Sequence, residues 1–169
     1  MSRNERKGRP VRQRSILAAA IAAAISVAAT AASAGECPAG RKVADGQGQK
    51  MVTHGAKDVS DKVRASTDLS KEAVALKDRL FRLRELEIKP GGIVPWHSHD
   101  ERPAMIYIVS GEVTEFASNC SVPIVHKAGD VAPEARGTSH WWQNHGKHAA
   151  KLISVDIFPV ADKKNEKMM

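Results

Sequence analysis

The chain has few aromatic residues, few cysteines and no excess of one charge beyond its first residues. Of its 169 residues, seven are Phe, Tyr or Trp and two are Cys, so only one intramolecular disulfide is possible. The net charge is +7, but six of the 26 Lys and Arg precede residue 15. From Gly35 onward, 20 basic and 18 acidic residues leave a net charge of only +2. This balance of charge gives no reason to expect a nucleic-acid partner. The length of the chain suits one domain and excludes a large multidomain enzyme.

The first 34 residues have the three parts of a secretory signal peptide. A basic stretch to Arg14 precedes an apolar run over 16–32, and Ala32-Ser33-Ala34 is a small-residue cleavage site. An uncleaved membrane anchor is the alternative, but the run is mostly alanine and only weakly hydrophobic. We therefore expect cleavage after Ala34, giving a periplasmic or secreted protein with no stable membrane anchor.

The remaining chain divides into three predicted segments. Residues 35–67 begin rich in glycine, without apolar periodicity, and are expected to form a flexible N-terminal segment. Residues 68–160 are expected to form the folded domain, and 161–169 a solvated tail. Cys37 lies in the flexible segment and Cys120 in the domain. An oxidising compartment would permit a disulfide between them, and two separate thiols are the alternative.

Short apolar runs separated by turn residues follow Asp68. Residues 68–78 suit a short helix or an extended arm, and a predicted strand to Ile88 ends at the turn Lys89-Pro90-Gly91-Gly92. Six further runs follow at close spacing, over 93–96, 105–109, 113–117, 123–126, 140–144 and 152–158. This pattern predicts an all-β fold, either an antiparallel sandwich or a small barrel.

Three histidines are the main candidates for a functional site in the sequence. His97 and His99 are two residues apart, so on a strand both imidazoles project from one face and can share one ion. An exposed, histidine-containing loop is the alternative for that pair alone. Downstream, His140, Trp142 and Asn144 alternate on one face of another predicted strand. No Ser/His/Asp set, P-loop or dinucleotide fingerprint supports a different chemistry.

The spacing of these residues resembles the two motifs of the cupin superfamily. The first, G-x5-HxH-x3-4-E-x6-G, and the second, G-x5-P-x-G-x2-H-x3-N, are matched in order by Gly91, His97, His99 and Gly111, and by Gly129, Gly137, His140 and Asn144. The resemblance covers about residues 80 to 158. It implies a small jelly-roll β-barrel in which the two motifs meet around one metal.

Two positions depart from those motifs. Ala104 stands where the family has its glutamate ligand, and Ala135 stands where it has proline. The resemblance therefore implies a three-histidine site of His97, His99 and His140 for one divalent transition metal: Fe, Mn, Ni, Cu or Zn. Glu101 could supply the missing carboxylate, although exposure in a loop is the favoured interpretation. His126 is likewise expected to be exposed.

Further residues are predicted to serve a ligand or a partner. Arg102 beside the site could hold a carboxylate in bidentate fashion, and Trp142 and Asn144 share the face of His140. Tyr107 is expected to face outward, where an apolar set would suit a homodimer. Two functions are open: an exported, dioxygenase-like metal enzyme acting on a small organic substrate, and a non-catalytic small-ligand-binding or sensing cupin with weak or no metal.

Overall fold

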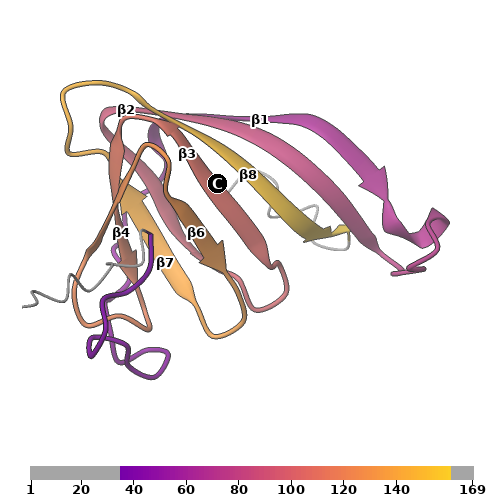
Figure 1. Ribbon diagram of the computed structural model, residues 1–169, viewed down its shortest axis with the longest axis horizontal. Helices are drawn as coiled ribbons and strands as arrows, with labels where there is room; N and C mark the ends of the chain where they lie inside the picture. Colours follow the sequence, from indigo (N-terminus) through magenta and orange to yellow (C-terminus); the bar gives the residue numbers. More distant parts are fainter. Residues whose placement is uncertain (1–34, 161–169) are drawn as a thin grey trace, which may run out of the picture. The chain divides into compact units, whose positions relative to one another are not determined.

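A computed structural model describes residues 35–160, which form eight strands and one short 3-10 helix (Figure 1). The predicted signal peptide at 1–34 and the predicted tail at 161–169 lie outside the described residues. Between residues 35 and 160, no helix has the length and apolar character needed to cross a membrane. The elements are β1 (Lys57–Asp68), η1 (Leu69–Lys71), β2 (Arg79–Ser98), β3 (Ala104–Ser110), β4 (Glu112–Ala117), β5 (Ile124–Lys127), β6 (Val131–Glu134), β7 (Ser139–Gln143) and β8 (Ala150–Pro159).

All strand pairs are antiparallel, and seven strands follow one another in the order β5-β4-β7-β2-β8-β3-β6. The sheet curls until it nearly closes, which confirms the predicted all-β jelly-roll barrel (Figure 1). Buried and exposed residues alternate along β3, β6 and β8, as expected for strands with one face toward a core and one toward water.

β2 is a single strand that bends where the sequence predicts a turn. Residues 79–88 pair with β8, and residues 93–98 pair with β7, so β2 takes part in both halves of the barrel. Gly91 makes the bend possible, because its φ of 75° is costly for other residues. A Cβ on Gly92 would lie 2.8 Å from the carbonyl oxygen of Lys89. The prediction of a turn between two strands at Lys89–Gly92 is therefore wrong, because these residues form a bend within the single strand β2.

β1 lies in part of the chain that was predicted to be flexible. Its 12 residues pair with β2, and β1, β2 and β8 run side by side (Figure 1). Most of its side chains are exposed on both faces, so no apolar alternation marks this strand in the sequence. Charged contacts fix it instead: Asp61 pairs with Arg84 at 2.5 Å, and Arg64 pairs with Glu85 at 2.8 Å.

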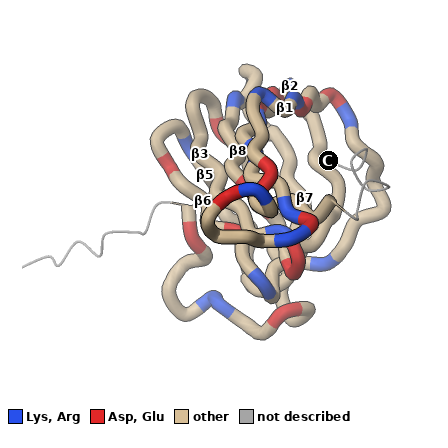
Figure 2. The backbone as a smooth tube through the Cα atoms, turned by 90° about the vertical axis from the view of Figure 1, so that its right-hand side faces the viewer, with Lys and Arg blue, Asp and Glu red and all other residues tan. Residues whose placement is uncertain are grey.

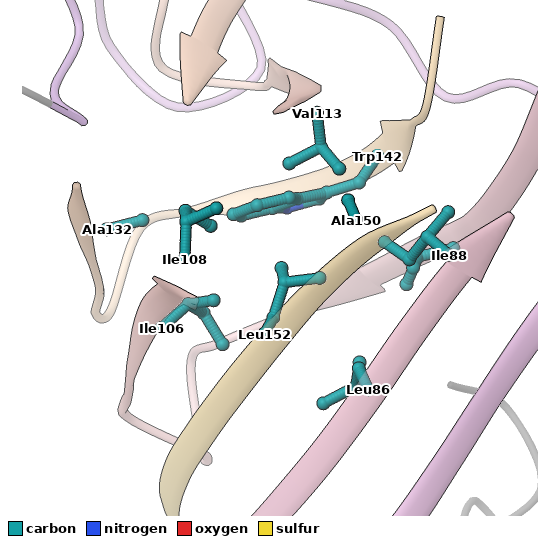
Figure 3. Packing of buried hydrophobic residues seen from close by; sticks show 10 residues of the cluster. Leu86, Ile88, Ile106, Ile108, Val113, Ala132, Trp142, Ala150 and Leu152 are labelled. Atoms are coloured by element: carbon teal, nitrogen blue, oxygen red, sulfur yellow. The ribbon is translucent and has the colours of Figure 1, made fainter. Parts of the chain in front are cut away.

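The main hydrophobic core fills the barrel. Figure 3 shows Trp142 among aliphatic side chains from several strands. Burying one large apolar side chain contributes roughly 1.5–3 kcal/mol, so this cluster is a major source of stability. Its members are Leu86, Ile88, Val94, Ile106, Ile108, Val113, Ala132, Trp142, Ala150 and Leu152.

The segment before β1 is attached to the barrel. Cys37 and Cys120 form a disulfide with an S–S distance of 2.01 Å. Backbone hydrogen bonds extend this contact: the amide of Val43 donates to the carbonyl of Asn119, and that of Ser121 donates to the carbonyl of Arg41, each at 2.9 Å.

Basic and acidic residues are interspersed over the side of the molecule drawn in Figure 2.

Candidate metal centre

The three histidines of the two motifs meet inside the barrel. β2 carries His97, His99 follows its last residue, and β7 carries His140, which is the register partner of His97. Nε2 of His140 lies 3.1 Å from Nε2 of His97 and 3.0 Å from Nε2 of His99. The pairing of β2 with β7 thus brings the three rings together.

The other nitrogen of each ring is tied to an oxygen acceptor. Nδ1 of His97 lies 2.9 Å from the carbonyl oxygen of Pro95, and Nδ1 of His99 lies 2.8 Å from that of Arg102. Nδ1 of His140 lies 2.6 Å from Oε1 of Glu115. Since these oxygens can only accept from the rings, each Nδ1 carries the proton and each Nε2 directs its lone pair toward the other two.

Glu134 joins this group from β6. Its Oε2 lies 3.0 Å from Nε2 of His99, and its Oε1 lies 3.4 Å from Nε2 of His140. Cross-strand pairing places Glu134 directly opposite Ala104 of β3, so the carboxylate enters beside the position where the cupin motif has glutamate. The three-histidine set is therefore incomplete. Glu101 is exposed and pairs with Arg79 at 3.3 Å, away from this group.

Sequence reasoning missed Glu134 because it missed β6. This strand has four residues, includes Pro133 and lies between turn residues, so its alternation is too short to stand out. The available signal was indirect: Ala132 and Glu134 have the parity of an inward-facing strand, and Glu134 immediately precedes Ala135 in the second motif.

The four side chains fit a divalent transition metal. Their donor atoms lie within 4.8 Å of one another, and three of the residues are buried. Three nitrogen lone pairs facing one another at 3.0–3.1 Å repel unless a cation or a proton lies between them. Imidazole nitrogens with one carboxylate suit Fe(II), Mn(II), Ni(II), Cu(II) and Zn(II).

The charges around the centre shift the pKa values of its members. Burial lowers the pKa of His97 well below its usual value, and the neighbouring His140 and His99 lower it further, which favours the neutral form that binds metal. Burial alone would also lower the pKa of His140, but the carboxylates of Glu134 and Glu115 raise it. For Glu134, burial opposes ionisation, and His140 and His99 nevertheless hold its pKa below the usual range.

A cavity with a free volume of about 20 Å³ lies against the centre. Arg84, His97 and Glu134 contribute its polar lining, and Trp142 contributes an aromatic wall, as its parity with His140 predicts. The guanidinium of Arg84 is held by the hydroxyl of Ser154 at 2.9 Å and by Asp61. Arg84, which sequence reasoning did not select, thus places a fixed positive charge in the wall.

Arg102 and Asn144 have different surroundings from those predicted. Arg102 is buried, its carbonyl oxygen accepts from His99, and its Nε lies 3.9 Å from Asp156. Burial, and after it the neighbouring Arg84, lower the pKa of Arg102 to about 10. Asn144 donates to the carbonyl oxygens of Ile88 and His148, each at 2.8 Å, so it fixes the loop after β7 and its amide is not free for a ligand.

His126 is fully buried, which corrects the prediction that it would be exposed. Its Nε2 lies 2.8 Å from Oε2 of Glu115, whose other oxygen contacts His140. Burial alone would raise the pKa of Glu115, but His140 and His126 lower it to about 2, so the carboxylate is ionised. Neither residue of this pair could be recognised from local sequence, because β4 and β5 must pair before the two side chains meet.

Comparison with known proteins agrees with the resemblance of the two histidine motifs to those of the cupin superfamily. The cupin domain model matches residues 84–156. An oxalate-binding protein of Thermotoga maritima is 37% identical over 89 residues, covering 53% of this chain and 70% of the relative. Nectarin-1 of Nicotiana langsdorffii × Nicotiana sanderae is 32% identical over 76 residues, covering 43% of this chain and 33% of the relative.

Among solved structures, a predicted oxalate decarboxylase from Thermotoga maritima has a TM-score of 0.49 and 24% identity. That similarity covers 69% of this chain and 98% of the other. The match to the domain model and to most of the oxalate-binding relative, on a barrel with both histidine motifs in place, shows that the chain belongs to the cupin superfamily.

Proposed function

We propose that this cupin binds a small carboxylate, with oxalate as the first candidate, at a divalent transition metal held by His97, His99, His140 and Glu134. The observation that carries the proposal is the convergence of three Nε2 atoms and one carboxylate, with each Nδ1 occupied elsewhere. The similarity to an oxalate-binding protein over 70% of its length supports the choice of ligand.

The charge of the centre favours an anion. Glu134 neutralises one of the two charges of a divalent ion, and the ion would supply the remaining positive charge to the oxygens of a ligand. Arg84 adds a guanidinium to the wall of the same cavity. Asp61 and Asp156 offset the charge of Arg84, so the guanidinium contributes hydrogen-bond donors to an organic anion while the ion supplies the net positive charge.

The size of the cavity favours a ligand of few heavy atoms. The cavity of about 20 Å³ beside Trp142, Ile106 and Leu152 has room for about one water molecule, so every organic ligand needs side chains to move, and a catechol or a flavonoid needs far more movement than oxalate. Oxalate is planar and small, and its adjacent carboxylates can bind one ion through two oxygens.

Calorimetric titration of oxalate into metal-free and Mn(II)-loaded protein tests the proposal. We expect binding only to the loaded protein, and about tenfold weaker binding for Arg84→Gln, which corresponds to about 1.4 kcal/mol. Arg79→Gln is the matched control, because Arg79 pairs with the exposed Glu101 and does not line the cavity. Equal binding by the metal-free protein would contradict the proposal.

Oxidative cleavage of the ligand is the second candidate. Four protein donors leave two positions open on an ion that takes six ligands, which is what a dioxygenase-like reaction requires. Oxygen consumption by the Fe(II)-loaded protein in the presence of oxalate would support turnover. Binding without oxygen consumption would leave the non-catalytic role.

We also propose that the protein is exported, on the evidence of its leader. The basic stretch, apolar run and Ala32-Ser33-Ala34 site support cleavage before Gly35. Intact mass of the protein recovered from the periplasm or medium should correspond to a chain that starts at Gly35. Retention of the leader in a membrane fraction would contradict export.

An exposed apolar face supports the homodimer that we propose. Met105, Tyr107 and Val109 on β3 are each about half exposed, and register places Tyr107 between Val131 of β6 and Ile153 of β8. Neighbouring exposed apolar side chains are a feature of protein interfaces. Light scattering should give a dimer for the parent and a monomer for Tyr107→Lys. Val125→Lys, an equally exposed valine on β5, should stay dimeric.

A further inference from the structure

A buried pair of side chains lies behind the proposed centre and is not one of its ligands. Glu115 comes from β4 and His126 from β5, and both are buried. A buried carboxylate is costly unless its oxygens are hydrogen-bonded, so its partners identify its role. Oε1 of Glu115 contacts Nδ1 of His140 at 2.6 Å, and Oε2 contacts Nε2 of His126 at 2.8 Å.

The orientation of this pair is fixed from both sides. The ring of His126 stacks on Trp142 with a centroid distance of 4.7 Å and an interplanar angle of 9°. Nε2 of His126 donates to Oε2 of Glu115, while Oε1 of the same carboxylate contacts His140. Nε1 of Trp142 lies 3.1 Å from the same Nδ1 of His140, a longer contact than that to the carboxylate.

His140 therefore differs from the other two histidines. Nδ1 of His97 and of His99 each face a neutral backbone carbonyl, whereas Nδ1 of His140 faces an ionised side chain. A charged acceptor gives a stronger hydrogen bond and makes the opposite ring nitrogen a better electron donor.

From this geometry, and resting on the proposed metal-binding function, we infer that Glu115 and His126 are positioning residues for the metal centre. Glu115 accepts the Nδ1 proton of His140 and so keeps Nε2 free and directed at the ion. His126 holds Glu115 in place through its second oxygen.

Co(II) is the probe for this inference, because its paramagnetism shifts the proton resonances of its ligands. We expect Glu115→Gln to weaken Co(II) binding about 10–100-fold and His126→Phe, which keeps a flat ring on Trp142, to weaken it by less. The exchangeable Nδ1 proton of His140 should move or broaden in Glu115→Gln, while those of His97 and His99 should stay in place. A purely structural role would not produce this selective change.

The control is Glu112→Gln, which removes an exposed acid of the same strand that pairs with Lys127 of β5. It should bind Co(II) like the parent. Glu115→Asp retains the charge and should recover part of the affinity lost in Glu115→Gln. Parent-like affinity and an unshifted His140 proton in Glu115→Gln would overturn the inference while leaving the metal centre intact. Absence of Co(II) binding by the parent would overturn the proposed function itself.

Discussion

Glu134 supplies from β6 the carboxylate that the cupin motif places at the position of Ala104. Its two oxygens face His99 and His140, so under the proposed function its removal should cost more metal affinity than the loss of a residue outside the proposed ligand set. We expect Glu134→Gln to weaken Mn(II) binding by at least about 100-fold. Glu101→Gln, which removes an exposed acid, should bind Mn(II) like the parent. A large loss of affinity in this variant would indicate that Glu101 is the carboxylate ligand.

Glu115 also gives the metal-free protein a defined pH dependence. His140 and His126 lower its pKa from 4.5 to about 2 in the folded state, against the effect of burial. The ionised form therefore stabilises the fold above about pH 4.5, and this contribution of about 3 kcal/mol is lost as the pH falls toward 2.

Urea unfolding at about pH 7, 5 and 3 measures this effect. The free energy of unfolding of the parent should fall steeply below about pH 5. Glu115→Gln should start lower and fall less, because it has no carboxylate to protonate. Equal slopes for the two proteins would show that Glu115 is not held ionised by its histidine neighbours.

At the scale of elements, β3 and β6 together decide which residue supplies the carboxylate. Ala104 and Glu134 are direct cross-strand partners, so their side chains share a face and have Cβ atoms roughly 5 Å apart. We expect Ala104→Glu combined with Glu134→Ala to bind metal more tightly than Glu134→Ala alone. Titration of both variants with Mn(II) tests this. Failure of the double variant to recover affinity would mean that a carboxylate on β3 cannot replace the one on β6.

Part of the candidate site could be predicted from the sequence, and part of it depends on how the strands pair. Strand periodicity predicts that His97 and His99 share a face, and the resemblance to the two cupin motifs implies that His140 meets them, which the pairing of β2 with β7 brings about. Glu134 required knowledge of strand pairing, which no local pattern contains. β1 escaped prediction for a related reason: most of its side chains are exposed, so it has no apolar alternation.

For the whole molecule, the disulfide connects the segment before β1 to the barrel. Cys37 and Cys120 are 83 residues apart, and closing a loop of this length removes unfolded-state entropy worth about 4.5 kcal/mol. The double variant Cys37→Ser, Cys120→Ser should lose free energy of unfolding of this order and keep its metal affinity, since neither cysteine touches the centre. Unchanged stability in urea would contradict the stabilising role of the bond.

The most direct test of the central claim is the metal content and metal affinity of the purified protein. Mass spectrometry of the Mn(II)-equilibrated parent should give one ion per chain, and the double variant His140→Ala, Glu134→Ala should retain almost none. Oxalate should then bind to the loaded parent alone. Equal metal retention by the parent and the double variant would contradict a centre built from His97, His99, His140 and Glu134.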